Sequence, residues 1–194
     1  MKDKTYNYNL ITREKIITEK DLSNGNLILL ASRPCIGKTK TCCYLFEYYS
    51  KKYSCLYFDL SGSSSSYFLG NKEQNGLIFD FTPSVEMIKK IQNGIKYDNL
   101  KIVFIDYSQL LTNTDNWFLN MLLELCSNHK IVIIITSQLS RKIEKRRQHL
   151  PKYKDLRNIK NIFYACRKCV VITCPYAYGE SEKYELVYLL YKSN

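Results

Sequence analysis

The segment from Asn24 to Cys43 constrains the fold of this chain more than any other. Its sequence, NGNLILLASRPCIGKTKTCC, contains an apolar run from Leu27 to Ala31 that is typical of a buried strand. A polar loop follows, and a helical pattern starts directly after it. Strand, loop and helix in this order predict a phosphate-binding loop, because free backbone N–H groups at a helix start can surround a phosphate. An ordinary strand–turn–helix junction is the alternative.

The side chains of this loop supply the remaining chemistry of a nucleotide site. The ammonium of Lys38 would neutralise the terminal phosphates, and the hydroxyl of Thr39 would bind Mg²⁺. The usual pattern starts with glycine, and serine stands there instead. The expected nucleotide contacts span the loop and the first helical turn: Ser32, Arg33, Pro34, Cys35, Ile36, Gly37, Lys38, Thr39 and Cys42.

Strand and helix patterns alternate along most of the chain. Helices are expected at residues 40–52, from Pro83 to a turn at Asn93 and Gly94, and at residues 116–128. Strands are expected at residues 55–60, 77–81, 100–105, 130–136, 169–174 and 184–191. This alternation indicates an α/β fold with a mainly parallel central sheet flanked by helices. The length of 194 residues favours one domain, residues 23–194, preceded by a polar N-terminal arm over residues 1–22.

Two polar side chains follow buried strands and complete the predicted nucleotide site. Asp106 ends the strand LKIVFI, where a carboxylate would hold the Mg²⁺ shell from the side opposite Thr39. Gln138 follows the most hydrophobic strand, KIVIIIT, and we interpret it as a sensor of the terminal phosphate or its attacking water. The carboxyl ends of parallel strands meet at one edge of a sheet, so these groups should converge. A turn-starting aspartate and an ordinary loop amide are the alternatives.

Positive charge is concentrated in one segment. The formal net charge is +11, and residues 139–168 contain eleven Lys or Arg residues against only Glu144 and Asp155. Such a surplus predicts a site for a polyanion, and a solvated charged loop is the alternative. The expected contacts with such a polyanion are Arg141, Lys142, Lys145, Arg146, Arg147, Lys152 and Lys154.

Composition argues against several other classes of protein. The eight cysteines lie mostly among apolar positions, which favours reduced, buried thiols over a disulfide scaffold. Zinc binding by Cys166, Cys169 and Cys174 is disfavoured because no second ligand pair accompanies them. No segment reaches the roughly 18 consecutive apolar residues of a membrane span, and residues 1–9 are too polar for a signal peptide. We therefore expect a cytoplasmic protein.

In their order, these motifs resemble the C-terminal ATPase domain of the DnaB family of replicative helicases, which has a RecA-like P-loop NTPase fold. ASRPCIGKT is similar to the family's A-R-P-x-M-G-K-T loop, and FIDYSQLL resembles its I-D-Y-L-Q-L strand. SQLSR and the later DLR resemble the family's S-Q-L-N-R and D-L-R-E segments. IFDFTPSVEMIKKI also looks like the strand and helix that come before the family's Mg²⁺ strand.

The resemblance implies ATP and Mg²⁺ as cofactors and single-stranded DNA as a partner. It implies that Lys38 contacts the β- and γ-phosphates, that Thr39 and Asp106 serve Mg²⁺, and that Gln138 couples the γ-phosphate to the DNA-binding loops. In the family these loops face the channel of a homo-hexamer. Other replication proteins, such as a replicative helicase or a primase, are further implied partners.

Three departures from the family pattern affect the expected activity. The family places a catalytic Glu after its second strand, and FDLSG puts Ser61 there, so hydrolysis would depend on Asp59 as a substitute base. Asn194 stands where the family has its arginine finger. The family's N-terminal domain and linker helix have no counterpart in these residues, which would weaken a hexamer.

Two functions from different classes follow from this pattern. The first, which we favour, is an enzyme: a DnaB-like helicase that couples ATP hydrolysis to movement on single-stranded DNA. The second is an accessory or regulatory relative that binds nucleotide and DNA with impaired hydrolysis, and Ser61 and Asn194 favour it. A small P-loop kinase fits less well, because such enzymes normally keep the glycine that Ser32 replaces. A RecA-type recombinase is close in fold but less similar in motifs.

Overall fold

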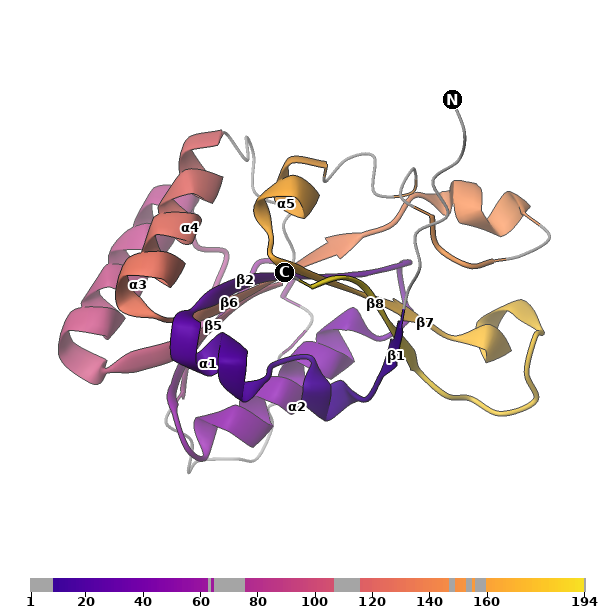
Figure 1. Cartoon of the computed structure of the whole chain (residues 1–194), viewed down its shortest axis with the longest axis horizontal. Coiled ribbons are helices and arrows are strands. Elements are labelled where there is room, and N and C mark those ends of the chain that lie inside the picture. Colours follow the sequence, from indigo (N-terminus) through magenta and orange to yellow (C-terminus); the bar gives the residue numbers. More distant parts are fainter. Residues whose placement is uncertain are drawn as a thin grey trace.

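A sheet of eight strands forms the centre of the described chain in the computed structural model (Figure 1). The structure describes residues 9–62, 64, 76–106, 116–146, 149–152, 155 and 160–193. The strands are β1 (Asn9–Ile11), β2 (Asn26–Ser32), β3 (Ser54–Asp59), β4 (Gly76–Asp80), β5 (Leu100–Asp106), β6 (Val132–Gln138), β7 (Lys168–Thr173) and β8 (Val187–Ser193). The α-helices are α1 (Glu19–Asn24), α2 (Lys38–Ser50), α3 (Ser84–Asp98), α4 (Asn116–His129) and α5 (Lys160–Ala165).

The sheet is mainly parallel, as the sequence predicts. Its strand order is β1-β8-β7-β2-β6-β5-β3-β4, and every pair from β7 to β4 in that order runs parallel. Only β8 and β1, at one end, pair antiparallel to their neighbours. Since β2 lies between β7 and β6, the loop after β2 emerges near the middle of the carboxyl edge. The strand that carries Asp106, β5, is one strand further along, beyond β6.

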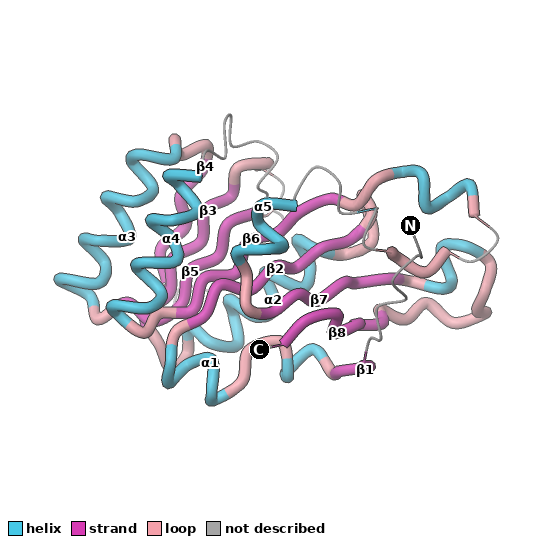
Figure 2. The backbone as a smooth tube through the Cα atoms, turned by 45° about the horizontal axis from the view of Figure 1, so that its top comes forward, coloured by secondary structure: helices cyan, strands magenta, loops and turns pink. Residues whose placement is uncertain are grey.

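Helices cover both faces of the sheet and create two cores (Figure 2). In β2, alternate residues serve opposite faces: Leu27, Leu29 and Ala31 belong to the core beneath α3, α4 and α5, whereas Ile28 and Leu30 belong to the core beneath α2. Every residue of β2 is buried. A strand buried on both faces explains the continuous apolar run in the sequence, in place of the alternation of a half-exposed strand.

The N-terminal segment contributes more to the fold than its polar sequence suggests. Residues 9–11 form β1, which pairs with β8 at the edge of the sheet. Ile16 and Ile17 are 0% and 2% exposed and lie in the core beneath α2. Helix α1 begins with a capping box between Thr18 and Asp21. Residues 9–24 therefore pack against the sheet, while the domain boundary at residue 22 stays a prediction.

One predicted turn is wrong. The sequence predicts a turn at Asn93 and Gly94, but α3 continues through both residues to Asp98. Gly94 is buried against the sheet, and a Cβ at this position would approach Cδ2 of Leu100 to 3.1 Å. The glycine therefore serves close helix–strand packing, which the dipeptide Asn-Gly alone cannot distinguish from a turn. The predicted surface loop at residues 62–76 lies largely outside the described residues.

Two general expectations can be compared with the structure. All eight cysteines are free thiols, and seven of them are buried, with Cys35 exposed. Within the described ranges, no helix is both long and apolar enough to pass through a membrane.

Candidate nucleotide and nucleic-acid site

The loop between β2 and α2 contains two residues with a positive φ. Gly37 is the N-cap of α2 with φ 100° and ψ 20°, and Cys35 also has a positive φ of 61°. A Cβ on Gly37 would lie 2.9 Å from Cδ1 of Leu186, which precedes β8. The positive φ is what favours glycine here, because the flexible end of the Leu186 side chain could shift to admit a Cβ. The first N–H groups of α2 have no partner within the helix, as a phosphate site requires.

Lys38 is held inside this loop by weak contacts. Its side chain is buried, at 6% exposure, and Nζ donates to Oγ of Ser32 at 3.3 Å and to the carbonyl oxygen of Arg33 at 3.4 Å. Burial lowers the pKa of Lys38, and the nearby carboxylate of Asp106 opposes this lowering. Both side chains are buried and their charges interact, while their joint role in a nucleotide site stays a prediction. Long hydrogen bonds of this kind are weak, so a phosphate oxygen can replace them at small cost.

Asp106 is fixed by hydroxyl groups from two neighbouring strands. Its carboxylate is fully buried, Oδ1 accepts a 2.6 Å hydrogen bond from Thr136 on β6, and Oδ2 accepts a 3.1 Å hydrogen bond from Tyr57 on β3. The Tyr57 ring stacks on Phe104 at a centroid distance of 5.8 Å, which fixes its position. A carboxylate accepts about four hydrogen bonds or ligand contacts in total, so capacity for a metal remains.

Sequence reasoning missed both of these hydroxyl donors. Thr136 is the first hydroxyl-bearing residue after the apolar run of β6, and that polar interruption was an available signal. The sequence held no such signal for Tyr57, because a tyrosine within an apolar strand is typical of the hydrophobic core.

The remaining predicted nucleotide residues line the same edge. Gln138 is the register partner of Ser32, and the N–H of Leu139 donates to the Ser32 carbonyl oxygen at 2.8 Å. Thr39 is half-buried in the first turn of α2. Cys42 is fully buried one turn later, where burial raises its thiol pKa well above the ordinary value. The strand carrying Gln138 thus lies beside the phosphate-loop strand, while its role as a sensor stays a prediction.

The donor set fits a magnesium nucleotide. The loop offers the hydroxyl of Thr39 next to Lys38 in the chain, and the buried carboxylate of Asp106 acts on the charge of Lys38. Mg²⁺ usually takes only one or two protein ligands beside phosphate oxygens and waters. Among the residues that the structure describes, no three His, Cys, Asp or Glu side chains gather as a metal-binding group. That observation disfavours a metal cage built by the protein alone, and it does not conflict with a nucleotide-borne ion.

Asp59, which the sequence offers as a substitute for the family's catalytic Glu, is occupied by its own loop. Oδ1 accepts hydrogen bonds from the N–H and Oγ of Ser61 at 3.0 and 2.9 Å, and Oδ2 accepts from the N–H and Oγ of Ser64 at 2.7 and 2.5 Å. Burial acts to raise the pKa of Asp59, but the hydrogen bonds from Ser64 and Ser61 outweigh it, and the net shift is downward. A carboxylate with a lowered pKa and four donors is a weak base.

The basic segment begins directly after β6, beside the phosphate loop (Figure 1). Its first part is a 3₁₀-helix, η3 (Arg141–Lys145), anchored by the buried Ile143. Four predicted DNA contacts are exposed: Arg141, Lys142, Lys145 and Lys152. Arg147 and Lys154 lie outside the described residues.

Arg146 differs from the other predicted DNA contacts because it is committed to the protein. Its guanidinium forms a two-fold ion pair with Asp155, at 2.9 and 2.6 Å, and also donates to the carbonyl oxygen of Leu150 at 2.8 Å. These bonds fold the segment back on itself. A role in DNA binding stays a prediction, but the geometry assigns this arginine a structural task.

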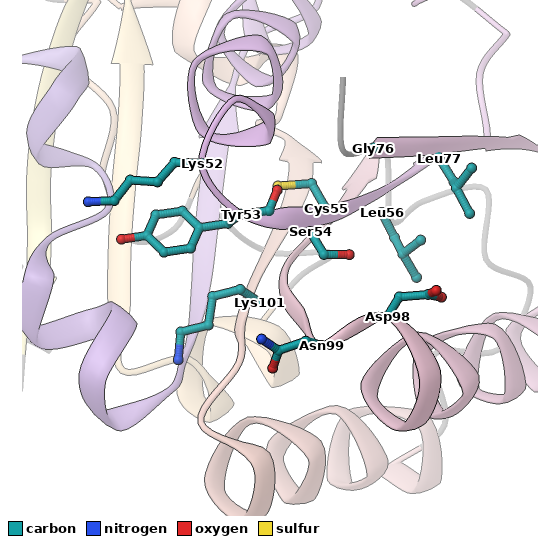
Figure 3. A pocket seen from close by; sticks show the side chains of 10 residues that line it. All are labelled: Lys52, Tyr53, Ser54, Cys55, Leu56, Gly76, Leu77, Asp98, Asn99 and Lys101. Atoms are coloured by element: carbon teal, nitrogen blue, oxygen red, sulfur yellow. The ribbon is translucent and has the colours of Figure 1, made fainter. Parts of the chain in front are cut away.

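A separate pocket lies at the opposite edge of the sheet (Figure 3). Its lining comes from the starts of β3, β4 and β5 and from the end of α3, and it includes Lys52, Tyr53 and Lys101. Lys101 is engaged there, since Nζ donates to the carbonyl oxygen of Lys130 at 2.8 Å. Parallel strands separate this amino edge from the carboxyl edge by their full length, so the pocket is not part of the nucleotide site.

Comparison with protein families now adds to the geometry. Residues 68–185 match the family described as "DnaB-like helicase C terminal domain", which is more than half of the chain. The chain belongs to this family. Asp106 and Gln138 lie within the matched range, whereas the phosphate loop lies before it. A comparison with curated protein sequences found no significant match.

Solved structures place this DnaB-like domain among RecA-like folds. A solved ATPase domain aligns with a TM-score of 0.72 and 20% identity, covering 88% of this chain and 78% of its own. A solved DnaB-like replicative helicase, described with its interactions with primase, aligns with a TM-score of 0.70 and 21% identity. That alignment covers 92% of this chain but only 57% of the longer helicase chain. At such identities the likeness shows the fold alone.

Proposed function

We propose that this chain is the ATP- and single-stranded-DNA-binding domain of a DnaB-like replicative helicase, in which ATP hydrolysis drives movement along DNA. The observation that carries the proposal is the burial of Lys38 and Asp106, whose charges interact, at a loop that contains two residues with a positive φ. Assembly into a hexamer, contact with other replication proteins such as primase, and a cytoplasmic location belong to the same proposal and are supported by the family alone.

Each predicted site residue has a part in this proposal. Lys38 would leave its weak contacts with Ser32 and Arg33 to bind the terminal phosphates. Thr39 and Asp106 would hold Mg²⁺, whose charge offsets that of the phosphates. Tyr57 and Thr136 position the Asp106 carboxylate. Gln138, beside the first residue of the loop, would respond to the γ-phosphate.

One observation favours a second function, that of a nucleotide- and DNA-binding accessory protein with impaired hydrolysis. Ser61 replaces the family's catalytic Glu and donates to Asp59 through both its N–H and Oγ. Asp59 is therefore poorly suited to activate water, since four hydrogen bonds already stabilise its charge. In this reading the chain would bind ATP without rapid turnover.

A paired measurement of ATP binding and ATP turnover separates the two functions. We expect the wild type to bind Mg–ATP and Lys38→Ala to lose that binding, because the ammonium of Lys38 is the group that would contact the terminal phosphates, whereas the other buried cation of the loop, Arg33, is paired with Glu144. Lys40→Ala is the matched control, since Lys40 is exposed on the same helical turn. Turnover stimulated by single-stranded DNA would support the helicase, whereas binding with background turnover would support the accessory protein. Absence of ATP binding by the wild type would rule out both.

The basic segment can be tested through the salt dependence of DNA binding. Replacing its exposed cations with alanine, at Arg141, Lys142, Lys145 and Lys152, should weaken binding of an oligodeoxythymidine and flatten the plot of log affinity against log salt. Each lost phosphate contact reduces the slope by about 0.7 for single strands. A control with equal charge loss replaces four exposed lysines elsewhere: Lys51, Lys89, Lys96 and Lys130. Equal effects in the two variants would locate the DNA site outside the basic segment.

A further inference from the structure

We propose that the ion pair between Arg33 and Glu144 couples nucleotide binding at the phosphate loop to nucleic-acid binding by the basic segment. The proposal rests on the proposed function and adds the physical link between its two sites. Arg33 belongs to the phosphate loop, and Glu144 belongs to η3 at the start of the basic segment. The pair is the direct side-chain connection between these segments that the structure records within its described ranges.

Arg33 is connected to the nucleotide site through its backbone. Its carbonyl oxygen accepts hydrogen bonds from Oγ of Ser32 at 2.7 Å and from Nζ of Lys38 at 3.4 Å. When Lys38 turns to a phosphate, it must leave this carbonyl oxygen. The backbone of Arg33 then loses a charged partner, while the side chain of the same residue remains attached to the basic segment.

The side chain of Arg33 is buried and incompletely bonded. Its exposure is 11%, Nη2 pairs with Glu144, and Nε and Nη1 find no hydrogen-bond partner among the residues that the structure describes. Burial raises the pKa of Tyr178, and the Arg33 guanidinium opposes that rise, which places Arg33 against this ring as well. Leaving buried donors unsatisfied costs free energy, so a rearrangement that satisfies them is favoured when the loop changes.

Glu144 has an electrostatic effect on the nucleic-acid segment. Glu144 and Asp155 are the two acidic residues among the eleven basic residues of segment 139–168, and both are paired with arginine. Asp155 pairs locally with Arg146, whereas Glu144 pairs across to the phosphate loop. While Arg33 neutralises Glu144, the basic segment presents its full positive charge. If nucleotide binding weakens the pair, the freed carboxylate repels the phosphates of DNA at short range.

A third segment supports the same junction. Tyr178 ends the 3₁₀-helix η5 (Pro175–Tyr178) in the connection from β7 to β8, and its ring stacks on His149 of the basic segment with centroids 4.3 Å apart. Nδ1 of His149 lies 2.7 Å from Oε1 of Glu180. The β7–β8 connection thus contacts the basic segment through His149, and its Tyr178 also interacts with Arg33. Figure 1 shows both segments at the carboxyl edge of the sheet.

The test is a thermodynamic cycle with two ligands. The affinity of the wild type for a labelled oligodeoxythymidine is measured without nucleotide and with a saturating non-hydrolysable ATP analogue and Mg²⁺. The affinity for the analogue is then measured with and without the oligonucleotide. Both ratios must agree, since coupling between two binding sites is reciprocal. In the wild type, we expect the ATP analogue to weaken oligonucleotide binding by at least about five-fold, which is the lower range for coupled sites.

Glu144→Gln should reduce this ratio to below about two, because it removes the charge that responds to Arg33. Glu182→Gln is the matched control: it makes the same change of charge at an exposed position of the β7–β8 connection, and its ratio should equal that of the wild type. The exchanged pair, Arg33→Glu with Glu144→Arg, should recover more of the ratio than Arg33→Glu alone. Each ratio compares a variant with itself, so a change in either affinity alone does not imitate lost coupling.

Two results would overturn the proposal while leaving the proposed function intact. The first is a wild type that binds both ligands with a ratio of one. The second is a Glu144→Gln variant whose ratio equals that of the wild type. Failure of the wild type to bind either ligand would overturn the proposed function and this inference together.

Discussion

Asp59 and Asp106 end neighbouring strands of the same sheet, are partners in its register and are both fully buried, yet their surroundings differ. Asp106 receives hydroxyl donors from two neighbouring strands and shares a buried region with Lys38. Asp59 receives four donors from the turn that follows its own strand. The comparison teaches that a carboxylate at the carboxyl edge is available for a ligand only when local backbone donors do not already surround it.

The largest expected difference between the two residues is in nucleotide binding. Asp106→Asn should weaken Mg²⁺-dependent ATP binding by at least about 100-fold, because losing a direct ligand charge costs no less than losing a supporting residue. Asp59→Asn should change the same affinity by less than about three-fold, since its carboxylate holds the protein chain. Isothermal titration of ATP at fixed Mg²⁺ measures both. Similar losses of ATP affinity in the two variants would show that both carboxylates contribute to nucleotide binding.

The next largest effect is on stability, where Asp59 is expected to matter more than Asp106. Asp59→Asn should lower the free energy of unfolding by about 1–3 kcal/mol, because hydrogen bonds to a charged acceptor are lost. The pKa of Asp59 lies below its ordinary value of 3.8 in the folded protein. Its contribution is therefore fully present above the unfolded pKa of about 3.9 and disappears as pH falls through the folded pKa.

Urea unfolding of the wild type and Asp59→Asn across pH measures this contribution. The gap between the two proteins should be widest near neutral pH and should close below about pH 4. A gap that stays constant through the acidic range would mean that the carboxylate charge is not what stabilises the turn.

The smallest expected effect concerns the donors that position Asp106. Thr136→Val keeps the shape of the side chain but removes the 2.6 Å hydrogen bond, and it should weaken Mg–ATP binding by about five-fold, equivalent to about 1 kcal/mol. Ser64→Ala is the matched variant in the loop after β3, because it removes one hydroxyl donor from Asp59. It should leave nucleotide affinity unchanged while lowering stability. An effect of Ser64→Ala on ATP affinity would remove the distinction between the two aspartates.

The sequence predicted the parts of this molecule that depend on local pattern. The apolar runs of β2, β5 and β6 are long and unbroken because these strands are buried on both faces, so their positions and the convergence of Lys38 with Asp106 could be anticipated. The packing of residues 9–24 could not be anticipated, because β1 has only three residues and is recognisable only by its pairing with β8. The continuation of α3 through Gly94 depends on contact with Leu100, which no local rule contains.

The same division applies to the candidate site. The residue types of the phosphate loop carry their chemistry in the sequence, whereas the donors to Asp106 come from two other strands and become neighbours only in the sheet. Arg146 illustrates the limit most clearly: its charge places it among DNA contacts, but its pairing with Asp155 depends on how the segment folds back. Arg33 and Glu144 lie far apart in sequence, so nothing local identifies them as a pair.

The central position of β2 has a consequence for how this domain moves. The strand is hydrogen-bonded to β6 along its whole length and to β7 along most of it, and none of its residues is exposed. Amide hydrogens in such a strand exchange with solvent only through opening of the entire core, not through local fraying. The strand that carries the phosphate loop is therefore a rigid base, and local changes of conformation in this domain are confined to the segments beyond the strand tips.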